Sequence, residues 1–222
     1  MAYDLSHIRN RVMNDKLDDP NYDPDIIDNF INDTQREIFQ AYEFPFAERT
    51  FSGTLSQGDT IFLFPTDYDV AQSLILTDPE DVRSNITDNY VGFRDFNTMY
   101  PKPTTQDPGT PRLWTLHGNR LYVDRPTDQI YTLDLWYLKL PNTLSDDADV
   151  PDLPEPYEEL LVMGAYYRCL ERNEDFDLAA VIEAKFNTKL DTIVGRATKR
   201  QAGKSILISQ PNRITSRRRT RR

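Results

Sequence analysis

The chain has 222 residues, of which 28% are charged and 38% are hydrophobic, and its formal net charge is -10. The single cysteine, Cys169, excludes an internal disulfide and is typical of proteins kept in a reducing cytoplasm. No segment approaches the ~18 consecutive apolar residues of a membrane span, and the first residues lack the apolar core of a signal peptide. We therefore expect a soluble, unexported protein without a membrane partner.

The first fifth of the chain predicts two helices. Asp4 can cap a short amphipathic helix, and a longer helix begins at Asp23, with Pro24 at its first position and Pro45 ending it. The short helix has its apolar face at Leu5, Ile8, Val12 and Met13. The longer one has its apolar face at Ile26, Ile27, Phe30, Ile31, Thr34, Ile38, Ala41 and Tyr42.

The middle of the chain predicts strands instead. The segments "TIFLFP" and "AQSLILTD" are short apolar runs. The segment "RLWTLHGNRLYVDRP" predicts a hairpin around Gly118-Asn119, because Gly supplies the positive φ of a two-residue turn. In "QIYTLDLWYLKLP" apolar and polar positions alternate, which is typical of a half-buried strand. Its predicted core side holds Tyr131, Leu133, Leu135 and Tyr137.

Helical spacing returns after the proline-rich acidic loop "PNTLSDDADVPDLPEP". One helix is marked by Tyr157, Leu160, Leu161, Gly164, Ala165 and Cys169. A longer one is marked by Leu178, Ile182, Phe186, Leu190, Ile193 and Ala197. The segment from Ala202 onward has no helix cap and little to bury, so we expect it to be extended or disordered on its own.

These patterns predict an α+β fold. Helices from both ends form a bundle, with a β-rich insertion between them and an extended basic tail at the C-terminus. The expected boundaries are 1–48 for the N-terminal helices, 49–141 for the insertion, 142–202 for the acidic loop and C-terminal helices, and 203–222 for the tail.

No residue pattern selects an active site. The chain has two histidines, His7 and His117, and no G-x-S-x-G motif. The segment "AGKSI" resembles the end of a phosphate-binding loop, but Thr198 stands where that loop needs glycine. The acidic clusters "LDDPNYDPD" and "LSDDADVPD" lack the Gly and the closing Glu of a calcium loop, so we interpret them as helix caps and solvated loops. We predict no enzymatic activity, no cofactor and no metal.

The distribution of charge is the feature that points to a function. Residues 196–222 hold ten Lys and Arg and no acid, whereas the preceding part holds sixteen basic and all 36 acidic residues, a net charge of -20. The basic tail can bind nucleic acid, or it can dock into an acidic groove on a partner protein. The apolar residues of "SILISQPNRI" favour protein docking, because a phosphate binder has no need of them. That segment also alternates as a strand does.

The order of motifs resembles the head-to-tail adaptor proteins of tailed bacteriophages, also called connector or head-completion proteins. The likeness rests on the helix "DIIDNFINDTQREIFQAYEFPFAERTFSGTL", on "GDTIFLFPTDY", on "YPKPTTQDPGTPRLWTLHGNRLYVDRPTDQIYTLDLWYLKLP" and on "LSDDADVPDLPEPYEELLVMGAYYRCLE". These stretches lie within residues 25–190, which is most of the chain.

The resemblance implies a structural virion protein at the head-tail junction, made in the host cytoplasm. Such adaptors form a twelve-fold ring below the portal. The ring extends the DNA channel and offers a platform for the tail or nozzle protein, and genomic DNA passes through it without sequence-specific binding. The resemblance also implies that the C-terminal segment docks on the portal protein. The portal-binding residues are then Ile206, Ile208, Pro211, Ile214, Arg217, Arg218, Arg219, Arg221 and Arg222.

Two other functions compete with this interpretation. The first is a DNA-binding accessory protein that acts through its arginine tail. The second is a cell-wall hydrolase with a carboxylate pair, although acids are so abundant that no pair stands out.

Overall fold

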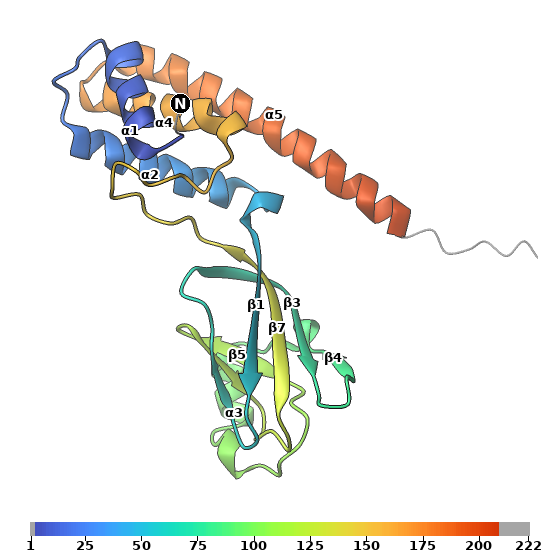
Figure 1. Cartoon of the computed structure of the whole chain (residues 1–222). Coiled ribbons are helices and arrows are strands. Elements are labelled where there is room, and N and C mark those ends of the chain that lie inside the picture. The colour runs from blue at the N-terminus through green and yellow to red at the C-terminus, as the bar shows by residue number, and fades with distance from the viewer. Residues whose placement is uncertain (1–2, 209–222) are drawn as a thin grey trace, which may run out of the picture.

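The computed structural model describes residues 3–208, and the side chains of residues 3–198. Helices from both ends of the chain lie together, and the strands form a second lobe beside them (Figure 1). Within the described residues the protein is an α+β protein with five α-helices and two antiparallel sheets. Each lobe has its own hydrophobic core.

The first two helices of the helical lobe begin at the predicted caps, Asp4 and Asp23. Asp4 Oδ1 accepts the His7 amide at 2.8 Å, and Asp23 Oδ1 accepts the Asp25 amide at 3.1 Å. The lobe consists of α1 (Leu5–Asn10), the π-helix η1 (Arg11–Leu17), α2 (Pro24–Ala41), α4 (Glu158–Arg172) and α5 (Phe176–Ile208). Its fully buried side chains include Leu5, Ile8, Val12, Ile27, Ile31, Leu161 and Phe186.

Helix α2 ends earlier than Pro45, where the sequence predicts its end. The backbone is already extended at Tyr42, and Pro45 instead opens the 3-10 turn η2 (Pro45–Ala47). A proline disfavours helical backbone in the residue before it. Phe44, which is that residue, is extended and buried. Pro45 thus accounts for the extended backbone at Phe44, whereas the helix has already ended at Ala41.

The β lobe consists of two antiparallel sheets. One has the order β1-β7-β3-β4, from Glu48–Leu55, Tyr131–Lys139, Tyr68–Thr77 and Arg83–Asn85. The other has the order β2-β6-β5, from Ile61–Leu63, Arg120–Val123 and Trp114–His117. The lobe also holds α3 (Phe93–Met99) and the 3-10 turns η3 (Thr87–Asn89) and η4 (Pro103–Thr105), which the sequence patterns do not predict; η5 (Glu155–Tyr157) precedes α4.

The predicted hairpin and the predicted alternating strand are confirmed. β5 pairs with β6 around Gly118, whose φ is 61°. In β7 the predicted core side, at Tyr131, Leu133, Leu135 and Tyr137, is buried. Leu138, the next residue of the same strand, belongs to the core of the helical lobe, so β7 contributes to both cores.

Helix α5 is longer than the sequence patterns predict. We expected the helix to give way to an extended segment from Ala202, yet the helix continues to Ile208. That prediction is therefore wrong for residues 202–208. A cap is needed only where a helix ends, so its absence at Ala202 does not stop the helix. Gly203 lowers the stability of the helix by only about 1 kcal/mol relative to Ala. The rest of the predicted tail lies outside the described residues.

Candidate docking surface

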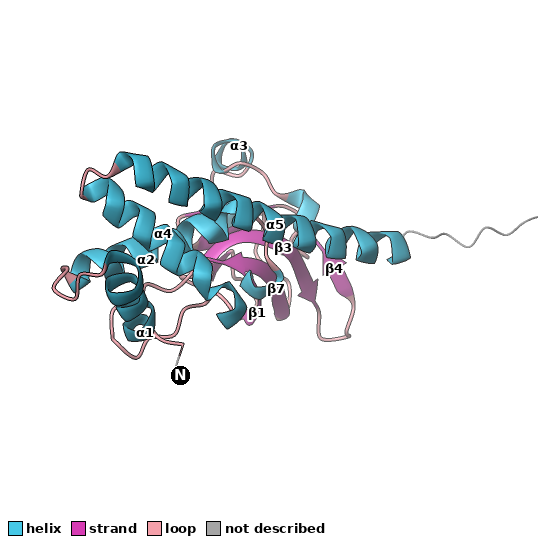
Figure 2. Ribbon diagram, turned by 90° about the horizontal axis from the view of Figure 1, so that it is seen from above, coloured by secondary structure: helices cyan, strands magenta, loops and turns pink. Residues whose placement is uncertain are grey.

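Helix α5 projects from the helical lobe. It packs along α4 and then extends past the other helices (Figures 1 and 2). Phe186, Leu190 and Ile193 are the buried anchors of this packing. The second half of α5 thus forms an arm that starts from a fixed base in the helical core.

Only some of the predicted portal-binding residues belong to α5, which ends at Ile208. Ile206 and Ile208 belong to its last turn. Positions two apart share a face in a strand but not in a helix, so the strand-like alternation does not apply to these two. The other predicted residues, which are Pro211, Ile214, Arg217, Arg218, Arg219, Arg221 and Arg222, lie outside the described residues.

An apolar groove lies beside the base of the arm. It has a volume of about 320 Å³ and is lined by Phe44, Pro45, Phe46, Pro154, Pro156, Tyr157, Ile193, Arg196 and Ala197. The rings of Phe44 and Phe46 are stacked with centroids 4.8 Å apart, and Tyr157 lies 6.0 Å from Phe46. We did not predict this groove, because its walls come from three separate segments. The proline-aromatic runs "FPF" and "PEPY" are the only sequence signal that could have suggested it.

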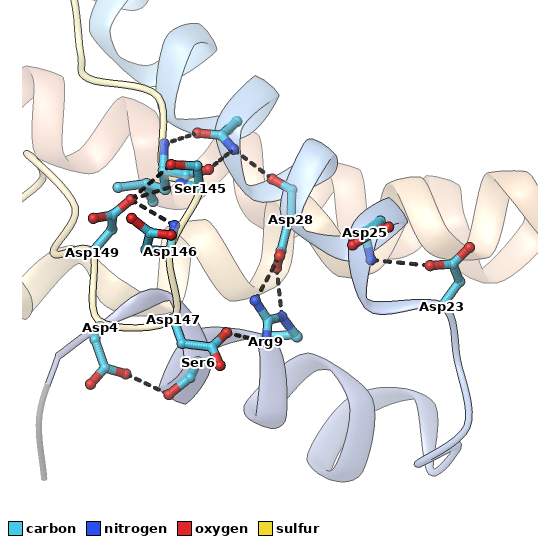
Figure 3. Close-up of polar contacts among 12 residues, drawn as sticks. Asp4, Ser6, Arg9, Asp23, Asp25, Asp28, Ser145, Asp146, Asp147 and Asp149 are labelled. Carbon is cyan, nitrogen blue, oxygen red and sulfur yellow. Dashed lines mark hydrogen bonds and ion pairs between the residues drawn. The ribbon is translucent and has the colours of Figure 1, made fainter.

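The N-terminal helix is held to the lobe by ion pairs. Arg9 contacts Asp28 through Nε and Nη2 at 2.7 and 2.6 Å, and Asp147 through Nη1 at 2.7 Å (Figure 3). Arg11 contacts Glu158 and Glu159 at 2.7 and 2.9 Å. These contacts join η1 and α1 to α2, α4 and the acidic loop.

The acidic clusters hold loops and helix ends, as predicted. The Asp149 carboxylate accepts the amides of Ser145 and Asp146 (Figure 3). The backbone carbonyl of Asp149 accepts the Leu5 amide at 2.9 Å. The bonds from Asp146 and Ser145 lower the pKa of the Asp149 carboxyl. Lys139 Nζ lies 2.5 Å from Asp152 Oδ1, and the Lys139 side chain is only 5% exposed. Among the described residues no group of three or more His, Cys, Asp or Glu is placed to hold a metal ion.

His7, His117 and Cys169 are not among the residues that line the groove. His7 Nε2 is 3.2 Å from Glu158, and the His117 ring is stacked on Phe93 with centroids 4.0 Å apart. Cys169 is buried in the helical core, and burial raises the pKa of its thiol to about 11. The described residues include no helix long and apolar enough to cross a membrane.

The comparison with protein families agrees with the order of motifs. A family model described as "SU10 adaptor protein" matches residues 3–214, nearly the whole chain. No curated protein matches the chain significantly. The matched residues include the helical lobe, the β lobe and the whole of α5. The chain belongs to the SU10 adaptor protein family, and it is a structural adaptor of a bacteriophage virion.

Proposed function

We propose that this protein is a head-to-tail adaptor that forms a twelve-fold ring below the portal. The ring extends the DNA channel and provides the attachment platform for the tail or nozzle protein. The portal is the partner of the C-terminal segment. The single observation that carries this proposal is the α5 arm, which leaves an acidic body and leads into a basic segment.

The arm suits a protein partner better than DNA. Ile206, Ile208, Pro211 and Ile214 accompany the arginines, and such apolar residues contribute to an interface only when a protein surface covers them. The arginines at 217, 218, 219, 221 and 222 can form paired hydrogen bonds with carboxylates of the portal. Each copy on its own binds weakly, because ordering the segment costs about 1–2 kcal/mol per residue. A ring presents many copies at once and gains affinity through avidity.

The acidic body is consistent with a channel wall. The part before Arg196 has a net charge of -20. Like charges repel the DNA backbone, so genomic DNA can pass without being gripped. The same charge opposes association of free subunits, and we therefore propose that the ring forms on the portal rather than in solution.

The test uses DNA-filled, tailless heads of the cognate phage. Labelled protein is added, the particles are treated with nuclease and sedimented, and the copies per particle are counted. Three forms are compared: the full chain, a chain ending at Ile208, and a full chain with the five C-terminal arginines changed to lysine. The truncation leaves α5 complete, and the lysine form keeps the charge but loses the paired geometry.

The two competing interpretations predict different results. A portal-bound ring gives about twelve nuclease-resistant copies per head, which are lost on truncation and reduced by the lysine form. A DNA-binding accessory protein instead dissociates with nuclease and retains most of its binding in the lysine form. It also binds naked DNA with a salt slope of about -0.9 for each phosphate contacted. That second outcome would show that the proposed function is wrong.

A further inference from the structure

We infer that strand β2 binds an extended segment of another protein, which adds a further strand to the edge of the three-stranded sheet. The segment pairs with the outward backbone groups of Ile61 and Leu63 and packs apolar side chains beside theirs. The inference goes beyond the proposed function, because it depends neither on the ring nor on docking to the portal.

Strand β2 is bonded to a neighbour on one side only. It lies at one edge of the sheet β2-β6-β5. The Phe64 amide donates to the Asn119 carbonyl at 2.9 Å, and the Val123 amide donates to the Thr60 carbonyl at 3.0 Å. Hydrogen-bonded pairs alternate along an antiparallel ladder, so the bonded pair between these two is the one at Phe62.

The same alternation turns Ile61 and Leu63 outward. Their amide and carbonyl groups point away from β6, and no hydrogen bond joins these groups to another of the described residues. Their side chains are also open to solvent, with Ile61 44% exposed and Leu63 60% exposed. The edge of β2 therefore presents free backbone groups and apolar side chains together.

The other sheet edges are protected against such pairing. The outer edge of β5 is covered by the chain at Val91, whose amide donates to the Trp114 carbonyl at 2.9 Å. Strand β4 is polar at every position, and the exposed residues of β1 are all polar. An open edge with exposed apolar side chains is a pairing site that natural sheets otherwise avoid. We take this contrast to mean that a partner covers β2.

The core holds β2 ready for a partner. The Phe62 side chain points inward, and its ring centroid lies 5.9 Å from that of Phe51 on β1. Gly53 makes room for this ring, since a Cβ atom added there would stand 2.3 Å from it. A strand that is already fixed loses little conformational freedom on binding, so few contacts suffice for affinity.

The outer face of the sheet indicates which side chains the partner carries. Ile61 stands opposite Tyr122, and the two share this face with Leu63. Helix α3 covers the β5 half of the face through Phe93, whose ring stacks on His117 and lies 6.1 Å from Tyr122. The β2 half has no such cover. Side chains alternate between the faces of a strand, so the partner needs apolar residues at every second position.

The occupant is another protein rather than this chain. Only an extended backbone matches the outward groups of β2. Residues 209–222 do not alternate in this way, because Ile214 is their single branched apolar residue. A second copy would bring its acidic body, with a net charge of -20 before Arg196, against an equal charge.

A peptide selection tests the inference. The probe is a library of random dodecapeptides, selected against the immobilised full chain. We expect the enriched peptides to alternate apolar and polar residues. The most enriched peptide is then synthesised, and its Kd is measured by fluorescence anisotropy. A selection that enriches no peptide would overturn the inference.

Two proline variants locate the binding edge. Leu63→Pro deletes an outward amide and leaves the bonds to β6 intact, which a strand at a sheet edge tolerates. It should weaken peptide binding by about tenfold, because a carbonyl of the peptide loses its donor. Arg83→Pro is the matched control, since the Arg83 amide points away from β3 in the same manner. The control should leave the Kd unchanged, and circular dichroism checks the fold of both variants.

Methylation of the peptide provides a test on the wild-type protein, which remains decisive if Leu63→Pro does not fold. Two forms of the peptide carry N-methyl groups on alternate amides. Strand pairing predicts that only the form whose methylated amides face β2 loses binding. Equal losses in both forms would overturn the inference, as would equal affinity for the wild type and a folded Leu63→Pro. A dimer in sedimentation that Leu63→Pro converts to a monomer would make a second copy the occupant, and this too would overturn the inference.

Discussion

Thr34 of α2 lies directly against Gly164 of α4. A Cβ atom added at Gly164 would stand 2.2 Å from the Thr34 methyl carbon and 2.6 Å from its hydroxyl oxygen. The Thr34 hydroxyl donates to the Phe30 carbonyl at 2.7 Å and accepts from Arg168 at 2.8 Å. The two helices thus meet at a contact that has no room for another carbon atom.

Gly164→Ala is therefore expected to destabilise the helical lobe. Overpacking of this kind costs about 1–3 kcal/mol. Urea unfolding monitored by circular dichroism measures the change in the free energy of unfolding. Adding Thr34→Ala should recover part of the loss, because it removes both atoms that clash with the new methyl group. If Gly164→Ala alone leaves stability unchanged, α2 and α4 do not pack as closely as described.

A second prediction concerns Asn32, which clamps the acidic loop. Its side-chain amide donates to the Leu144 carbonyl at 2.9 Å and accepts from the Leu144 amide at 2.8 Å. Asn32→Ala leaves both buried backbone groups without these partners, so we expect a loss of about 2 kcal/mol. Asn29→Ala is the matched control, since Asn29 is exposed on the same helix. Equal effects of the two changes in urea unfolding would contradict the clamp.

Much of this fold follows from local chemistry. Asp23 and Pro24 mark the start of α2 because a cap and a proline both suit the first turn of a helix. Gly118 marks the hairpin because the turn needs positive φ there. The buried side of β7 is visible as alternation, since one of its faces packs on the β-lobe core. These signals lie within a few residues of the structure that they specify.

Other features depend on contacts between distant segments. The groove needs Phe46, Tyr157 and Ile193 together, and no local pattern brings them into one place. The end of α2 at Ala41 and the length of α5 both differ from the prediction. Helix α2 ends at Ala41 with neither glycine nor proline at the next position, and helix α5 continues through Ala202, where the missing cap marks no end. The Asp149 carboxylate binds amides of its own loop, as the sequence pattern indicates, whereas backbone groups of the loop bind α1 and α2 through contacts that only the fold brings together.

Acidification should loosen the docking of the N-terminal helix. The His7 amide and the Ser6 hydroxyl bind the carboxylate of Asp4 and lower its pKa, and the Asp146 and Ser145 amides do the same for Asp149. Because both pKa values are lower in the folded protein, the stabilisation is complete above the ordinary value of 3.8. It is lost as the pH falls through 3.8 towards the lower values of the folded state.

The measurement compares the pH dependence of urea unfolding for the wild type and for Asp4→Asn/Asp149→Asn. The variant should be less stable than the wild type at pH 7, and the difference should shrink as the pH falls below 4. The many other acids affect both proteins alike, so the difference isolates these two. A constant difference across the acid range would mean that neither carboxylate is linked to folding.

Cys169 should resist thiol reagents until the helical lobe unfolds. The thiolate is the form that reacts, and a pKa of about 11 leaves roughly one thiol in a thousand ionised at pH 8. The side chain is also fully buried between α4 and its neighbours, so a reagent has no access to it. The reaction with an aromatic disulfide reagent at pH 8 should thus be slow in buffer and complete within minutes in concentrated denaturant. A variant carrying Val181→Cys supplies the control, because its new thiol lies at an exposed position and should react at once. Rapid labelling of Cys169 in the native wild type would mean that α4 opens readily, which is incompatible with a rigid base for the α5 arm.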